Sequence, residues 1–142
     1  MDYKDRKAWQ RRKDGSYCSC DGSRPRFTVY PVYNRIYGGD CWKLTDSITG
    51  ETDFRKTFTD CRTSASRMAE TVSRRPPEEY AVGMIAYTGS GEKVRIDSIG
   101  EKGYDCRYTF LSGSREGKQG FIAEVNWLFV ERIYEKSDMS IL

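Results

Sequence analysis

Val82-Gly-Met-Ile-Ala-Tyr87 opens a run of short strands, cut by glycine turns, that continues to Lys136 and decides the fold that the sequence predicts. The later segments are Glu92-Lys-Val-Arg-Ile-Asp-Ser-Ile99, Tyr104-Asp-Cys-Arg-Tyr-Thr-Phe-Leu111, Phe121-Ile-Ala-Glu-Val125 and Trp127-Leu-Phe-Val-Glu-Arg-Ile133. Each is rich in β-branched and aromatic residues, and the glycines between them supply the positive φ angles that tight hairpins need. We therefore predict a meander that closes into a small barrel, because closure removes exposed strand edges.

The N-terminal half predicts three strands and then one helix. The expected strands cover Phe27–Tyr33, Cys41–Thr45 and Asp53–Phe58. A helix is expected from Thr59 or Asp60 to about Arg74, because an N-cap residue there precedes a stripe of apolar side chains at helical spacing. The stripe consists of Cys61, Ala65, Met68 and Val72. The pair Pro76-Pro77 would end the helix.

Two resemblances follow from these patterns. Residues 27–72, with three strands and a helix that opens just after Phe-Thr-Asp, resemble the arm-type β-β-β-α modules of tyrosine recombinases. That resemblance implies a sheet that lies in the major groove of DNA. Residues 82–136 resemble Tudor-like and other SH3-like barrels, which usually bind ligands and seldom catalyse reactions. A Tudor-like barrel would bind methylated side chains in an aromatic cage, for which Tyr87, Tyr104, Tyr108 and Phe110 are available; the alternative is that these rings fill the core.

The predicted fold class is therefore α+β, with a small antiparallel three-stranded sheet and one helix followed by an SH3-like small β-barrel. The predicted parts are a basic arm at 1–26 that orders only against a partner or the rest of the chain, a β-β-β-α module at 27–75, a proline-rich linker at 76–80, the barrel at 81–136 and a tail at 137–142.

The net charge of +3 is unevenly distributed. Residues 1–26 carry +4 and residues 60–75 carry +2, whereas residues 76–142 carry −3. Such a layout suits a polyanion, and the alternative is a solvated terminal segment. The candidate ligand-binding residues are Arg11, Arg12 and Lys13 on the arm, Arg62 and Arg67 on the helix, Arg115 and Lys118 on a polar loop, and Tyr30 and Tyr37 as stacking residues.

The polar loop covers residues 112–120 and is longer than a hairpin closure requires. Its backbone amides and two cations could hold a phosphate, and the alternative is a plain connector. The stretch Thr88-Gly-Ser-Gly-Glu-Lys93 lacks the residue order of a P-loop and is expected to be a hairpin turn.

Catalysis and metal binding are not predicted. The chain has no histidine, which removes the commonest general base and the usual Ser-His and Cys-His pairs. Cys18 and Cys20 have the only metal-like spacing; Cys41 and Cys61 could complete a four-cysteine set, but without a paired knuckle. We therefore expect free thiols, no cofactor and no catalytic residue, with the pKa of Cys61 lowered by the helix N-terminus.

The absence of a signal-like or membrane-spanning stretch predicts a cytoplasmic protein without a membrane partner. We predict a non-enzymatic binding protein for nucleic acid or a nucleotide, which acts through the arm, the helix arginines and the polar loop. The alternative is a phage or mobile-element inhibitor, with an anti-defence role, that blocks a host protein complex or sequesters a nucleotide signal. The sequence leaves a homo-oligomer open.

Overall fold

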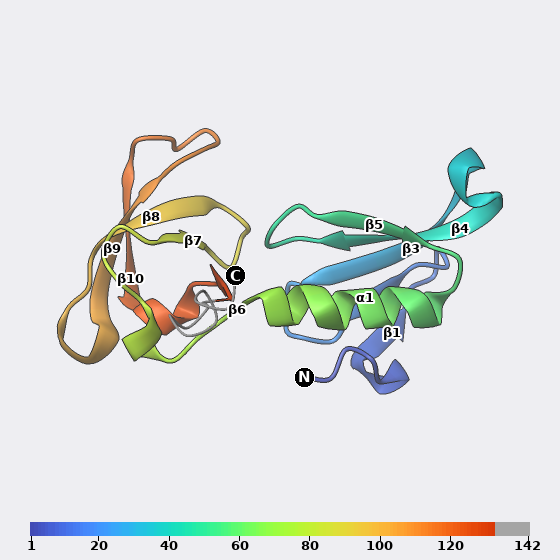
Figure 1. Cartoon of the computed structure of the whole chain (residues 1–142), viewed down its shortest axis with the longest axis horizontal. Helices are drawn as coiled ribbons and strands as arrows, with labels where there is room; N and C mark the ends of the chain where they lie inside the picture. Colours follow the sequence, from blue (N-terminus) through green and yellow to red (C-terminus); the bar gives the residue numbers. More distant parts are fainter. Residues whose placement is uncertain (133–142) are drawn as a thin grey trace, which may run out of the picture. The chain divides into compact units, whose positions relative to one another are not determined.

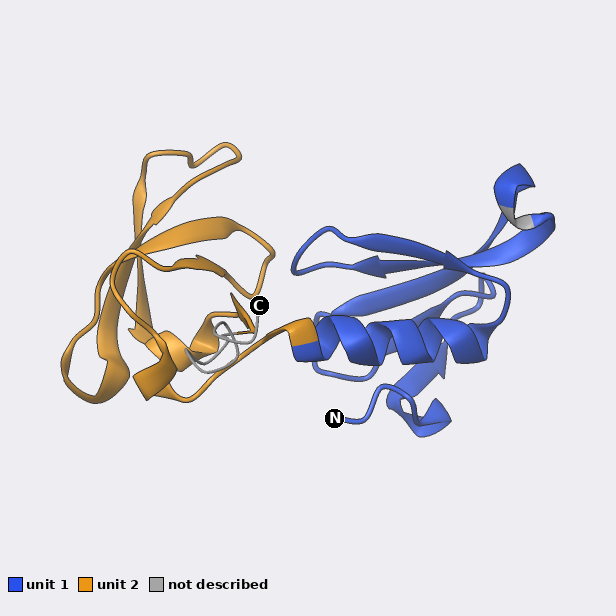
Figure 2. Ribbon diagram, viewed as in Figure 1, with its two compact units in different colours: residues 1–70 blue, residues 71–142 orange. Residues whose placement is uncertain are grey.

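The computed structural model describes residues 1–132, apart from the side chain of Tyr37. Within it the chain divides into two compact units, residues 1–70 (unit 1) and 71–142 (unit 2), coloured separately in Figure 2. The predicted tail at 137–142 and the last residues of the predicted barrel lie outside the described part. The predicted α+β class is confirmed, with one α-helix and two main antiparallel sheets among residues 1–132 (Figure 1).

Unit 1 is a five-stranded antiparallel meander followed by the helix. Its strands are β1 (Trp9–Arg11), β2 (Tyr17–Ser19), β3 (Phe27–Asn34), β4 (Gly39–Asp46) and β5 (Thr52–Arg55), in spatial order β1-β2-β3-β4-β5. The short 3₁₀ turns η1 (Arg6–Ala8) and η2 (Arg35–Tyr37) precede β1 and join β3 to β4. The helix α1 spans Phe58–Thr71, so the predicted helix is confirmed but ends before Arg74.

The core of unit 1 lies between α1 and one face of the sheet. Phe27 and Val29 of β3 and Leu44 of β4 are fully buried against the helix. The helix contributes three residues of the predicted stripe, Cys61, Ala65 and Met68, each at most 1% exposed. The fourth, Val72, lies beyond the helix in a short strand. The hydroxyl of Ser64 on α1 donates to the Asp53 carboxylate on β5 at 2.6 Å, which fixes the helix against the sheet edge.

The prediction of a three-stranded sheet is wrong, because the segment expected to form an arm supplies β1 and β2. Trp9 explains this order: its ring is 4% exposed in the core, and its indole N–H donates to the carbonyl of Tyr3 at 2.8 Å. A side chain of this size gains roughly 3 kcal/mol or more by leaving water, which outweighs the polar character of its neighbours.

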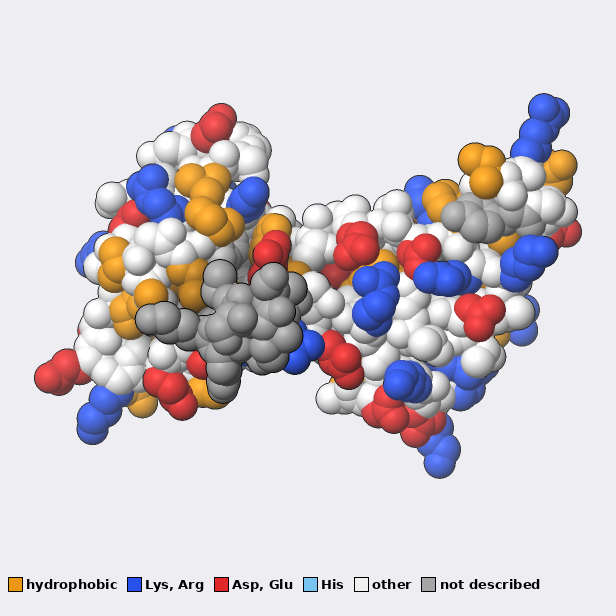
Figure 3. All heavy atoms as spheres, in the orientation of Figure 1, with side chains coloured by type: hydrophobic (Ala, Val, Ile, Leu, Met, Phe, Trp, Pro, Cys, Tyr) orange, Lys and Arg blue, Asp and Glu red, His pale blue; other side chains and the backbone are white. Residues whose placement is uncertain are grey.

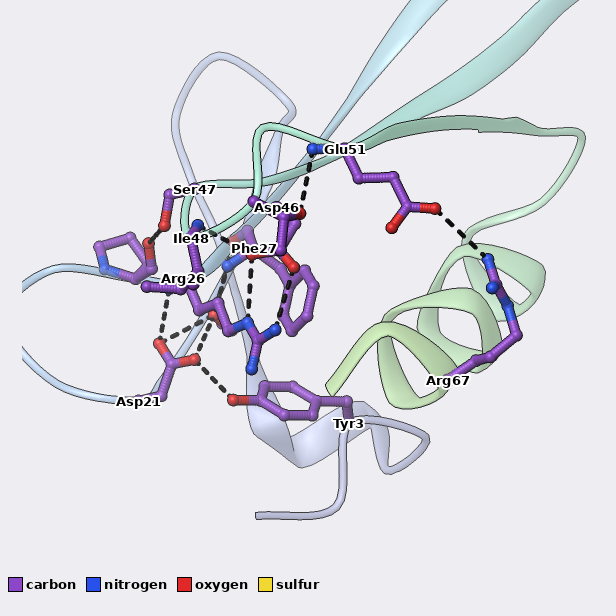
Figure 4. A network of polar contacts seen from close by, with 12 residues as sticks. Tyr3, Asp21, Arg26, Phe27, Asp46, Ser47, Ile48, Glu51 and Arg67 are labelled. Atoms are coloured by element: carbon purple, nitrogen blue, oxygen red, sulfur yellow. Dashed lines mark hydrogen bonds and ion pairs between the residues drawn. The ribbon is translucent and has the colours of Figure 1, made fainter. Parts of the chain in front are cut away.

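A buried network beside Trp9 holds the same segment through polar side chains (Figure 4). Arg26, 8% exposed, donates to both carboxylate oxygens of the fully buried Asp46 at 3.1 and 3.0 Å. Asp21 accepts from the backbone N–H of Arg26 at 3.0 Å and from the hydroxyl of Tyr3 at 2.9 Å. Burial, together with the hydrogen bond to Asp21, raises the pKa of Tyr3 far above its ordinary value. The N-terminal segment is thus linked to β3 and β4 through side chains as well as strand pairing.

Unit 2 contains a four-stranded antiparallel sheet of order β10-β9-β8-β7, and a two-stranded sheet in which β11 pairs with β6. The strands are β6 (Val72–Ser73), β7 (Ile85–Tyr87), β8 (Lys93–Ser98), β9 (Tyr104–Phe110), β10 (Gln119–Glu124) and β11 (Val130–Glu131). Three 3₁₀ turns join them: η3 (Pro77–Glu79), η4 (Glu101–Gly103) and η5 (Val125–Trp127).

No closed barrel is formed among the described residues, although an isolated bridge between Tyr87 and Phe129 links the two sheets of unit 2. The core contains Val94 and Ile96 of β8 and Leu128, all fully buried. The hydroxyl of Tyr80 donates to the carbonyl of Leu128 at 2.6 Å and accepts from the N–H of Arg75 at 3.0 Å. These contacts fasten the segment between β6 and β7 to the rest of unit 2.

The possible aromatic cage in unit 2 is excluded for two of its four rings, because they fill the core. Tyr108 and Phe110 are 8% and 4% exposed in the core, where they meet edge to face. Tyr104 is 52% exposed, so it does not share their environment. The alternation of β9 therefore directs Tyr108 and Phe110 inward, as core packing requires.

Candidate nucleic-acid interface

The second face of the unit 1 sheet is the candidate site. Strand alternation points Phe27, Val29 and Leu44 toward α1, so their neighbours in sequence point to the opposite side. Within residues 1–70 the structure places neither α1 nor η1 on that side, since α1 and Ala8 of η1 belong to the buried core. We call this surface the open face. Its residues are Gln10, Cys18, Thr28, Tyr30, Val32, Cys41, Lys43, Thr45, Thr52 and Phe54.

One row of the open face combines two aromatic rings with a cation. Tyr30 on β3 pairs directly with Lys43 on β4, which pairs with Phe54 on β5. The Lys43 ammonium lies 5.8 Å from the centroid of each ring. This distance is within the range of a cation–π contact, so the rings hold the lysine at the centre of the row. All three side chains are partly exposed.

The adjoining row, which we call the polar row, crosses all five strands and contains one glutamine and three threonines, with the buried Cys18 among them. Its directly paired members are Gln10, Cys18, Thr28, Thr45 and Thr52. Neighbouring strands lie about 4.8 Å apart, so the row is roughly 19 Å long. Threonine hydroxyls and a glutamine amide both donate and accept hydrogen bonds. The open face therefore places hydrogen-bonding groups beside a stacking and cationic row.

A shallow concavity of about 690 Å³ continues the open face at its β1–β2 end. Its lining includes Gln10 and Cys18 of the polar row, and also the sequence-predicted cations Arg11, Arg12 and Lys13. These cations are exposed, and within residues 1–132 no carboxylate forms an ion pair with them. The structure thus brings one predicted group of cations beside the open face.

The helix cations occupy the other side of unit 1. The Arg62 guanidinium lies over the Phe58 ring at 4.8 Å and donates to the carbonyl of Lys4 at 3.1 Å. Arg67 forms an ion pair with Glu51 at 3.9 Å. Figure 3 shows basic and acidic side chains interspersed over the helix. The structure therefore does not place these two arginines with Tyr30.

The polar-loop cations belong to unit 2. Arg115 donates to the Glu92 carboxylate at 2.7 Å, and its guanidinium lies 4.5 Å from the centroid of the Phe110 ring. Lys118 is exposed on the same loop. Arg115 therefore links the β9–β10 loop to the residue that precedes β8, and this structural role accounts for Arg115 without a ligand. Of Tyr37 only the backbone is described, in η2; its side chain lies outside the described part.

Sequence reasoning missed Lys43 and Phe54, which complete the row around Tyr30. The strand expected over Asp53–Phe58 is shorter in the structure, because β5 ends at Arg55 and Phe58 begins α1. Tyr30 was predicted from residue type, whereas the three-strand register that joins it to Lys43 and Phe54 depends on the turn at 47–51.

Two of the buried cysteines have raised pKa values. All five cysteines are free. Burial raises the pKa of Cys61 to about 12 and that of Cys106 to about 11. The expected lowering of the Cys61 pKa is wrong, because the loss of hydration around the buried thiol outweighs the field of the helix N-terminus. Among the described residues no group of three or more Cys, Asp or Glu side chains could hold a metal ion.

Comparison with known proteins finds no matching family model, no similar curated protein and no similar solved structure. Among residues 1–132 no helix combines the length and the hydrophobicity that crossing a bilayer requires.

Proposed function

We propose that unit 1 binds nucleic acid through its open face, without catalysing a reaction. The observation that carries the proposal is the row Tyr30–Lys43–Phe54, because it holds a cation between two partly exposed rings on a sheet face that α1 leaves uncovered. Aromatic rings on an exposed sheet stack on bases, and an adjacent ammonium neutralises phosphate. The polar row supplies groups that hydrogen-bond to base edges.

Charge supports a polyanion over a neutral ligand. Residues 1–70 contain fourteen Lys and Arg against ten Asp and Glu, a net charge of +4. Two of the acids, Asp46 and Asp21, are committed to Arg26 and Tyr3 inside the buried network and so do not oppose a ligand on the surface. Arg12 and Lys13, beside the concavity, extend the cationic path from Lys43 along the sheet.

The resemblance of residues 27–72 to arm-type DNA-binding modules agrees with this proposal, since such modules also lay their sheet against DNA. For unit 2 we infer an SH3-like fold. The strand order, the 3₁₀ turn η5 before the last strand and the pairing of β11 with β6 support this inference. The expected cytoplasmic location fits a nucleic-acid ligand.

Binding of a fluorescein-labelled oligonucleotide, single-stranded or duplex, tests the proposal by anisotropy at increasing salt. Lys43→Ala should weaken binding and flatten the salt dependence of log K by ~0.7–0.9. Tyr30→Ala and Phe54→Ala should each weaken binding roughly 5- to 100-fold through lost stacking. The matched controls are Lys56→Ala, an exposed cation between β5 and α1, and Arg115→Ala in unit 2.

The controls should bind within about twofold of the unaltered protein, since their side chains are not part of the open face. If Lys56→Ala and Lys43→Ala lowered the affinity equally, net charge alone would explain the loss, and the open face would be rejected as the binding site. No detectable binding at low salt would reject nucleic acid itself and favour the protein-inhibitor alternative.

A further inference from the structure

We infer that the β3–β4 hairpin inserts Ile36 between base pairs of duplex DNA beside the open face, so that the protein bends the duplex. The inference rests on the proposed function and names the form of nucleic acid that would be bound. The tip of this hairpin, residues 33–39, extends past the end of α1 (Figure 1).

The tip exposes large apolar side chains to an unusual degree. Ile36 is 88% exposed and Tyr33 is 71% exposed, the two highest values among the large hydrophobic side chains of the described chain. Burying an isoleucine is worth roughly 1.5–3 kcal/mol, and the hairpin forgoes this gain in the free protein. Within residues 1–70 the fold provides no core for Ile36, and insertion into a partner would bury it.

Two hydrogen bonds hold the backbone of the tip. The Asn34 side chain accepts a hydrogen bond from the backbone N–H of Ile36 at 2.9 Å, and the N–H of Gly38 donates to the carbonyl of Arg35 at 3.2 Å. Gly38 and Gly39 have φ angles of 82° and 117°, which few other residues adopt. A residue fixed in this way loses little conformational entropy on insertion.

The tip lies on the same strands as the stacking row. Asn34 follows Tyr30 by four positions on β3, a span of about 13 Å at 3.3 Å per residue. Successive base pairs of duplex DNA are 3.4 Å apart, so this span corresponds to about four base-pair steps. A duplex held at Lys43 would therefore reach the tip within half a helical turn.

Charge at the tip favours nucleic acid over a protein groove. Arg35, next to Ile36, is exposed, and within residues 1–132 the structure gives its guanidinium no ion-pair partner. Architectural DNA-binding proteins insert an isoleucine or similar wedge between base steps while adjacent basic residues hold the backbone, which kinks the duplex. Arg35 and Ile36 supply this combination of a cation and an apolar wedge at neighbouring positions.

The test measures bending of an end-labelled duplex by fluorescence energy transfer, together with the unstacking of 2-aminopurine placed along it, using the full chain. The unaltered protein should bend the duplex by about 20–90° and increase 2-aminopurine emission at one step. Ile36→Ser should abolish both signals and weaken binding by roughly tenfold, because the protein loses the wedge and the additional DNA surface that a bent duplex presents to it. Ile36→Met, which keeps an apolar wedge, should retain both signals.

Val82→Ser is the matched control, since Val82 is 63% exposed in unit 2 and its loss should change neither signal. The melting temperature of every variant should equal that of the unaltered chain, because both sites are exposed. A straight duplex in the complex, or bending that survives Ile36→Ser, would overturn the wedge. If the protein still binds nucleic acid through Lys43 in that case, the proposed function stands; if it binds no nucleic acid, both fall.

Discussion

The faces of the main β-sheet are covered differently in the two units. Within unit 1, α1 covers one face of the sheet and leaves the other uncovered, where Tyr30, Lys43 and Phe54 are partly exposed. Unit 2 buries the inner face of its sheet under segments outside that sheet, among them Tyr80, Val125 and Leu128. The polar-loop cation Arg115 is then used within the unit, as a partner of Glu92.

Charge divides in the same way. Residues 1–70 carry +4, and residues 71–142 carry −1. Basic residues are therefore informative about binding only where the fold leaves them without an ion pair and near groups that can contact a base. Lys43, Arg12 and Lys13 meet that condition in unit 1, whereas Arg115 does not meet it in unit 2.

The largest expected effect is a loss of stability confined to unit 1. Asp46→Ala leaves Arg26 charged and 8% exposed without its carboxylate, and also removes the acceptor of the Ile48 N–H at 2.9 Å. Breaking a buried ion pair in this way costs about 3–5 kcal/mol. Denaturant unfolding followed by tryptophan fluorescence should report it, since Trp9 and Trp42 lie in unit 1.

The control is Asp40→Ala, at an exposed position of the same strand, which should change stability by less than about 0.5 kcal/mol. If Asp46→Ala lowered the stability of both units equally, as seen at Trp127 of unit 2, the units would share one cooperative transition. The two units would then be separate in structure but would unfold together.

The next effect concerns the start of unit 2. The sequence places the barrel after the linker at 76–80, but β6 lies before it and pairs with β11. A chain of residues 71–142 should therefore melt cooperatively, and a chain of residues 78–142 should be about 2–3 kcal/mol less stable through the loss of buried Val72 and the β6 ladder. Circular dichroism melts compare the two. Equal melting temperatures would show that β6 is dispensable and would restore the linker as the boundary.

A smaller effect depends on pH. Burial alone would raise the pKa of Asp53, but hydrogen bonds from Ser64 and Arg55 and the charge of Arg55 hold it below its ordinary value. A carboxyl with a lowered pKa in the folded state stabilises that state above its unfolded pKa of about 3.9, and this contribution is lost as pH falls through the folded pKa.

Asp53→Asn should therefore lower the stability of unit 1 by about 1 kcal/mol at neutral pH and remove part of its decline below about pH 4. Urea unfolding at a series of pH values measures this, with Asp40→Asn as the control on the neighbouring strand. An unchanged acid limb in Asp53→Asn would mean that the link between α1 and β5 does not depend on charge.

Much of the fold follows from local pattern. The apolar spacing of Cys61, Ala65 and Met68 predicted the helix and its buried face, because periodicity of this kind depends on neighbours in sequence. The short strands β1 and β2 could not be predicted in the same way. They form because Trp9 and Arg26 reach partners far along the chain, and a polar three-residue strand carries too weak a local signal.

The candidate site was predictable only in part. Tyr30 and the Arg11–Lys13 group were named from residue type, whereas Lys43 and Phe54 depend on the register of three strands. Register is set by turn geometry and by which face is buried, and neither is visible in a single strand. Arg62 and Arg115 were selected for charge, which says nothing about the Lys4 carbonyl and the Glu92 carboxylate that contact them.

The smallest effect separates a structural cation from a binding one in unit 2. Arg115 is about half exposed, so its ion pair with Glu92 should contribute less than about 1 kcal/mol, with a further small gain from its contact with Phe110. Arg115→Ala should thus lower the stability of unit 2 slightly, and Lys118→Ala on the same loop should leave it unchanged. Neither variant should alter nucleic-acid affinity or its salt dependence beyond a twofold change. If Arg115→Ala instead left stability unchanged and reduced the salt slope as Lys43→Ala does, the ion pair would open on binding. Unit 2 would then be a second binding surface, and the contrast between the two units would lie in their packing alone.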